Sequence, residues 1–210
     1  MSTDTALAQY QALLHWIAQT TSDLTSQFPT EITCHRGCTG CCQQHLSVFE
    51  VEAENLHQFL KLLPEAVRHK LSHQARATLD REARFEAEHI APDTEFPPDP
   101  ARAIPCPALV DGECAVYPAR PVICRTHGFP LLYVDEERDE ALLDVCPLNF
   151  TEAEDTLNSL IETEVIPMSD INEHLVRANL AFLQNTTGGT ANALNRRSIA
   201  EILLSVVSSQ

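Results

Sequence analysis

The hydrophobic positions along the chain recur mostly at helical spacing. Between residues 3 and 27 they fall three and four apart, and Pro29 ends the pattern, so we expect an amphipathic helix there. A second helix is predicted over 48–63, and Pro64 begins a longer one that runs to about His89 with charges of alternating sign. Later helical patterns cover 152–162, 170–183 and 195–207.

One stretch of the chain predicts β-structure. Leu131–Val134 and Ala141–Leu143 are short apolar runs on either side of an acidic turn, which is typical of a β-hairpin. Six of the thirteen prolines lie from Pro92 to Pro107, and this density predicts an extended loop. The 210 residues are enough for one large domain with an ordinary hydrophobic core.

Charge and the missing motifs narrow the range of functions. The net charge is −16, from 30 acidic and 14 basic residues, so we expect no nucleic-acid partner and no anionic membrane partner. The chain has no Gly-rich dinucleotide motif and no P-loop. The first basic residue is Arg36 and no apolar run reaches about 18 residues, so we expect a cytoplasmic protein with reduced thiols. A protein partner stays open, and the oligomeric state is not predicted.

Eight cysteines form two groups. In the first group, a C-x-x-C step lets two thiolates point at one metal ion or cluster iron. The adjacent pair in that group cannot readily chelate one ion together, so its members serve different metals or irons, or one of them supports a ligand. In the second group, two cysteines precede proline, as in the bacterial ferredoxin run. The first group is Cys34, Cys38, Cys41 and Cys42, and the second is Cys106, Cys114, Cys124 and Cys146.

Basic residues flank one cysteine of the second group. Pro121 is predicted to begin a short helix that ends before Gly128, with Cys124 in its first turn, where the helix dipole favours a thiolate. Arg120 and Arg125 are therefore candidates to neutralise a thiolate-bound metal; the alternative is that they pair with surface carboxylates. His35 and His127 lie beside cysteines and are weaker candidates as ligands or proton donors, with a plain surface role favoured.

The combined motif resembles a known family. It reads Cys34-x3-Cys38-x2-Cys41-Cys42, then Cys106-Pro107-x-Leu109, then Cys114-x-Val116-Tyr117-x2-Arg120-Pro121-x2-Cys124-Arg125. This pattern, over about 30–147, is similar to the CxxxCxxCC cysteine-cluster family, described as zinc- or iron-chelating domains, to which flagellin lysine-N-methylase is also similar. The resemblance implies metal binding by the cysteines, and the methylase suggests a cluster combined with S-adenosylmethionine. The spacing of Cys34, Cys38 and Cys41 also matches a radical S-adenosylmethionine loop, but the chain lacks the strand–helix repeat of that barrel.

Together these patterns predict a mainly α protein. We expect a single helical domain over 1–210, with an irregular cysteine-rich metal core at 28–150, one short β-hairpin, and flanking helices at 1–27 and 151–210. All eight cysteines are candidate ligands of an iron–sulfur cluster, with [4Fe–4S] favoured, for redox, sensing or methyl-transfer chemistry. The alternative is a structural zinc-binding interaction module with two sites of four cysteines each, because eight thiols divide into two tetrahedral sets. Whether the protein is an enzyme stays open.

Overall fold

The computed structural model describes residues 3–44, 46–91, 99–135, 138, 140–152, 165–189 and 192–205. The chain divides into two compact units, and each is built from two separate stretches of sequence. Unit 1 comprises Met1–His35 and Pro121–Ala193, and unit 2 comprises Arg36–Arg120 and Leu194–Gln210. The single-domain organisation expected from the sequence stays a prediction.

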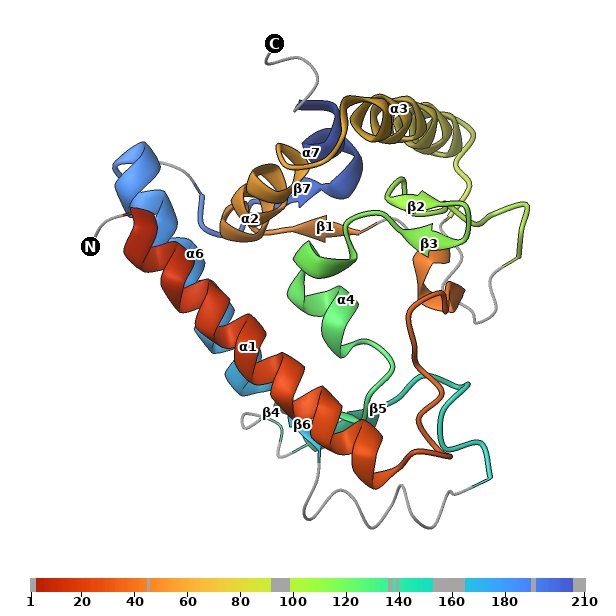
Figure 1. The fold of residues 1–210 in the computed structure, drawn as a ribbon, viewed down its shortest axis with the longest axis vertical. Helices are drawn as coiled ribbons and strands as arrows, with labels where there is room; N and C mark the ends of the chain where they lie inside the picture. Colours follow the sequence, from red (N-terminus) through yellow and green to blue (C-terminus); the bar gives the residue numbers. More distant parts are fainter. Residues whose placement is uncertain are drawn as a thin grey trace. The chain divides into compact units, whose positions relative to one another are not determined.

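Unit 1 is built on two long helices that pack side by side, α1 (Thr3–Gln27) and α6 (Met168–Thr187) (Figure 1). The apolar stripe predicted for the first helix is its buried face, because residues three and four apart lie on the same side of a helix. α6 ends where Gly188 adopts a left-handed φ of 64°. The buried residues of α1 are Ala6, Tyr10, Leu14, Ile17 and Leu24.

A three-stranded sheet and a short helix complete the described part of unit 1. β4 (Leu131–Asp135) pairs antiparallel with β5 (Glu140–Asp144), which confirms the predicted hairpin. The other edge of β4 pairs in parallel with β6 (Ile166–Pro167), which leads directly into α6. α4 (Val122–Thr126) contacts α1. The segment just before α4 and the segment just after it both belong to the cysteine motif.

Unit 2 packs α2 (Glu50–Leu60), α3 (Glu65–Ala87) and α7 (Ile199–Ser205) around one apolar core. β1 (Ser47–Val48) pairs antiparallel with β7 (Arg197–Ser198), and this ladder joins the two stretches of the unit. Small and branched side chains fill most of the core, so the helices can approach closely. Its buried residues are Val48, Ala53, Leu56, Leu60, Leu71, Ala75, Ala108, Val116, Ala119, Ile199, Ala200, Ile202 and Leu203.

A second hairpin lies in unit 2, between β2 (Leu109–Val110) and β3 (Glu113–Cys114). Its turn residues Asp111 and Gly112 have φ values of 52° and 82°. Positive φ at both central positions is the geometry of a type I′ turn, which an Asp-Gly pair adopts readily. The hairpin expected from the sequence is β4–β5, whereas this second hairpin, which carries Cys114, was not predicted although Asp-Gly is a local turn signal.

The helix boundaries differ from the predicted ones for a common reason. The helices predicted over 48–63 and 195–207 begin at Glu50 and Ile199, because the residues before them form β1 and β7. Pro121 lies just before α4 rather than at its first position, and Gly128 follows its end as expected. The helical pattern predicted at 152–162 lies almost entirely outside the described residues.

A mainly α fold is confirmed. No described helix is both long enough and apolar enough to cross a membrane.

Candidate metal centre

The fold divides the eight cysteines between the two units. Unit 2 contains Cys38, Cys41, Cys42, Cys106 and Cys114, whereas unit 1 contains Cys34, Cys124 and Cys146. All eight are free thiols. The boundary between the units falls at 35/36, inside the compact first group, so sequence proximity does not define the thiol sets.

In unit 2, backbone hydrogen bonds bring the two cysteine groups together. η1 (Gly40–Gln43) is a short 3-10 turn, and its last two residues lie beside residues 104–106. The Cys106 N–H donates to the Cys42 carbonyl at 2.7 Å, and the Ile104 N–H donates to the Gln43 carbonyl at 3.1 Å. The following hairpin pairs Cys114 with Leu109. Sixty-three residues separate Cys42 from Cys106 in sequence, so only the tertiary fold makes them neighbours.

In unit 2, the ionisation of Cys41 is coupled to Cys42, Cys106 and Cys114. A hydrogen bond with the Cys42 thiol, together with burial, raises the pKa of Cys41 far above its ordinary value. Burial raises the pKa of Cys106 to about 12 and also raises the pKa of Cys114; each of these thiols interacts with Cys41. Without metal these sulfurs are therefore neutral thiols at neutral pH. A metal ion would displace their protons on binding.

Two arginines lie near this thiol group and share one aromatic ring. The guanidinium of Arg120 lies 3.7 Å from the Tyr117 ring centroid, and that of Arg36 lies 5.6 Å from it. Arg36 also forms an ion pair with Glu113 at 3.0 Å, next to Cys114 in sequence. Arg120 lowers the pKa of both Cys41 and Cys114, which opposes the effect of burial. The positive charge of Arg120 thus stabilises the thiolate form of two candidate ligands.

In unit 1, Asn149 connects two segments of the cysteine motif. Its Nδ2 donates to the Gly128 carbonyl at 2.6 Å and to the Cys34 sulfur at 3.4 Å. Its Oδ1 accepts the Thr33 N–H at 2.8 Å and the Thr33 hydroxyl at 2.9 Å. These partners fix the amide orientation, because a carbonyl can only accept and an N–H can only donate. Asn149 is 3% exposed, so its amide group is shielded from water.

Gly128 leaves room for the Cys34 sulfur. Its φ is 107°, and a Cβ at this position would lie 2.7 Å from the Cys34 Sγ and 3.7 Å from the Cys146 Cβ. The left-handed backbone and the close approach both favour glycine there. Cys34, Gly128 and Cys146 thus converge in one place in unit 1, beside Asn149.

Unit 1 also contains the remaining candidate residues Cys124, Arg125, His127 and His35. Cys124 is the third residue of α4, in its first turn as predicted, and Arg125 lies in the last turn, in unit 1. Arg120 therefore belongs with the thiols of unit 2, whereas Arg125 belongs to the other unit. His127 caps the end of α4 through its backbone, and the exposed His35 ring hydrogen-bonds to the Thr33 carbonyl at 2.7 Å. Neither observation assigns a histidine as a ligand.

The donor chemistry suits a soft metal, because interacting thiols near a cation are the ligands of zinc and of iron–sulfur clusters. Cys41 interacts with Cys42, Cys106 and Cys114, and Arg120 supplies compensating charge. Within the described ranges, no three His, Cys, Asp or Glu side chains form a ready metal cage. Metal binding by these thiols would therefore require their side chains to move.

Comparison with known proteins agrees with this donor set. Residues 33–147, more than half of the chain, match the model of the CxxCxxCC family, described as "Putative zinc- or iron-chelating domain". The chain belongs to this family. No curated protein matches the chain, and no solved structure matches it. The part of the chain that matches the family model contains all of its cysteines.

The sequence analysis did not identify Asn149, interpreted Gly128 incompletely, and did not predict the turn at Asp111–Gly112. Asn149 follows the second Cys-Pro step, but its buried amide network depends on segments over a hundred residues apart. Gly128 was interpreted only as the end of a helix, while its contact with Cys34 is tertiary. The signal for the hairpin at Asp111–Gly112 was present in the sequence, because Asp-Gly between apolar residues is a strong local turn indicator.

Proposed function

We propose that the protein holds an iron–sulfur cluster on its cysteines, with [4Fe–4S] favoured, and serves redox, sensing or methyl-transfer chemistry. One observation carries the proposal. The Cys106 N–H donates to the Cys42 carbonyl at 2.7 Å, so a distant segment brings Cys106 and Cys114 to the adjacent pair Cys41 and Cys42, and both of these thiols interact with Cys41. A cluster bound by four thiolates carries net negative charge, and the Arg120 guanidinium offsets part of that charge in a chain that is strongly acidic.

A structural zinc protein is the second candidate. The family description supports it, because it names zinc as well as iron, and structural zinc sites are commonly built from four cysteine thiolates. In this alternative the thiols bind two zinc ions, each in a site of four cysteines, and the protein is an interaction module. The net charge of −16 argues against nucleic acid as the partner.

Metal analysis after anaerobic purification separates the two candidates. Iron and acid-labile sulfide in equal amounts, with broad visible absorbance, would support the cluster. Stoichiometric zinc in a colourless protein would support the alternative. A protein that takes up neither metal, even after reconstitution, would refute both proposals.

Variants test which thiols matter. We expect Cys41→Ser and Cys114→Ser to abolish loading, because both remove sulfurs from the interacting set of unit 2. Cys146→Ser, in unit 1, should leave a partly loaded, oxygen-sensitive protein. Thr39→Ser, in the same loop as Cys41, is the matched control and should load normally. Equal loss of metal in all three cysteine variants would contradict this ranking.

A further inference from the structure

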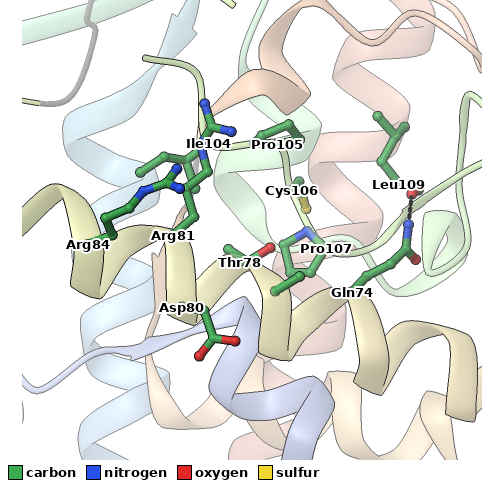
Figure 2. Close-up of a pocket in the computed structure, with 11 residues that line it drawn as sticks. Gln74, Thr78, Asp80, Arg81, Arg84, Ile104, Pro105, Cys106, Pro107 and Leu109 are labelled. Atoms are coloured by element: carbon green, nitrogen blue, oxygen red, sulfur yellow. Dashed lines mark hydrogen bonds between the residues drawn. The ribbon is translucent and has the colours of Figure 1, made fainter. Parts of the chain in front are cut away.

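A groove of about 540 Å³ opens beside Cys106 in unit 2. One wall is α3 and the other is the segment 104–109 (Figure 2). This volume is in the usual range for small-molecule sites. The walls are mixed: Pro105, Pro107 and Leu109 supply apolar surface, and α3 supplies polar side chains.

Two arginines meet at one end of the groove. Figure 2 shows Arg81 and Arg84 turned toward Ile104, whereas Asp80 points away from them. Both guanidiniums lie over the Phe85 ring, with distances of 4.9 and 5.7 Å to its centroid. Among the described residues, neither arginine has a carboxylate within ion-pair distance. The groove thus holds positive charge that the described part of this acidic chain does not neutralise.

The position of Arg81 is held by the backbone. Its Nη2 donates to the carbonyls of Pro100 and Ala101 at 3.3 and 2.9 Å. Its Nε is buried without a hydrogen-bond partner, and so is the Oε1 of Gln74 in the wall of the groove. Buried polar atoms without partners are uncommon and costly. A small rearrangement of these side chains would let a ligand oxygen accept from Arg81.

We propose that this groove binds a small organic anion. Its carboxylate would lie against Arg81 and Arg84, and its apolar body would lie along Pro105, Pro107 and Leu109. Arginine suits the negative end because its planar fork matches a carboxylate. Cys106 lines the same groove, so the anion would lie beside a candidate metal ligand. That last placement rests on the proposed function, whereas anion binding itself does not.

Calorimetric titration with three probes tests the proposal. Octanoate carries both the charge and the apolar body, octan-1-ol carries only the body, and acetate carries only the charge. We expect octanoate to bind at least tenfold more tightly than either of the others, because only it uses both ends of the groove. Equal affinity for octanoate and octan-1-ol, or no binding of octanoate, would overturn the proposal.

Variants locate the site. Arg81→Gln and Arg84→Gln should each weaken octanoate binding about tenfold, the usual effect of losing one charge-assisted hydrogen bond. Arg76→Gln changes the same charge on the same helix outside the groove lining, and should bind as the wild type does. Ala77→Glu keeps both arginines but adds a negative charge at an exposed lining position, so it should weaken octanoate binding as well. Wild-type affinity in the arginine variants would assign the binding to another surface.

The titration is repeated with the metal-free and the metal-loaded protein. Octanoate binding to the metal-free protein would support the groove whether or not the protein proves to hold metal. If the protein loads metal but octanoate does not bind, the groove proposal fails and the metal proposal stands.

Discussion

At the residue scale, the buried Asn149 and the partly buried His57 each depend on their hydrogen-bond partners. Asn149 uses both donors and its acceptor oxygen, and its partners are Thr33, Cys34 and Gly128. His57 is in α2, and its Nε2 is 2.7 Å from the hydroxyl oxygen of Ser205 in α7. Because buried polar groups depend on their partners, small chemical changes at either residue should have measurable effects.

Asn149→Asp should destabilise unit 1. The substitution keeps the acceptor for Thr33 but replaces the donor with a carboxylate oxygen that faces the Gly128 carbonyl and the Cys34 sulfur. We expect a loss of about 1–3 kcal/mol in the free energy of unfolding, measured by urea denaturation. Asn172→Asp, on the exposed face of α6, is the matched control. A loss no larger than that of the control would show that the network contributes nothing to stability.

His57 should make stability fall as the pH falls. Burial, reinforced by Arg197, lowers the pKa of His57 below its ordinary 6.5, although Glu54 opposes the shift. The unfolded chain therefore binds the proton first, so the stabilising contribution is present above about pH 6.5 and is lost as the pH falls below it. His57→Gln should show a smaller loss of stability between pH 7.5 and 5.5 than the wild type. His73→Gln, on the exposed face of α3, should keep the wild-type dependence; equal slopes in all three proteins would contradict the prediction.

At the scale of elements, short β-ladders set where cysteines lie and where helices begin. The β2–β3 hairpin places Cys114 opposite Leu109, and the β1–β7 ladder determines the starts of α2 and α7. Neither ladder is longer than two residues per strand, so each depends strongly on its turn or on the packing around it.

Gly112→Val should weaken the hairpin that carries Cys114. Gly112 has a φ of 82° with open space around its Cα, so the cost comes from backbone strain and not from a clash. We expect a loss of about 1–2 kcal/mol in the free energy of unfolding and a lower metal content. Gly112→Asn should restore most of both, because asparagine tolerates this conformation. If asparagine and valine behave alike, the turn geometry is not what positions Cys114.

At the scale of the whole molecule, two units carry separate sets of thiols. Cys38, Cys41, Cys42, Cys106 and Cys114 belong to unit 2, and Cys34, Cys124 and Cys146 belong to unit 1. The loop from Cys42 to Cys106 in unit 2 is long, so a metal bound at both ends would restrict the unfolded chain as well as stabilise the folded one.

Removal of metal should lower the melting temperature. A metal held a thousandfold above its dissociation constant adds about 4 kcal/mol, which corresponds to a shift on the order of 10 °C for a chain of this size. The measurement is calorimetry before and after chelation, with the metal content verified. Cys41→Ser should melt at the same temperature with and without chelator. An unchanged melting curve for the wild type after verified metal loss would refute the idea that metal joins distant segments.

Local patterns were sufficient for much of the fold and for the family. The apolar stripe over 3–27, the charge pattern of α3 and the runs around the β4–β5 turn all identified their elements, because helical and strand periodicity is a property of neighbouring residues. The spacing of the cysteines likewise identified the family. The Asp111–Gly112 turn was equally local and was available in the sequence.

Only the tertiary structure decided the contacts between distant segments. Pairing of Ser47–Val48 with Arg197–Ser198 shortens two predicted helices, and the hydrogen bond from Cys106 to Cys42 joins cysteine groups that lie far apart in the chain. The compact first group is divided between the units, and Asn149 is buried against Cys34. Periodicity carries no information on such contacts, because they arise from the packing of whole elements, and packing sets which thiols become neighbours.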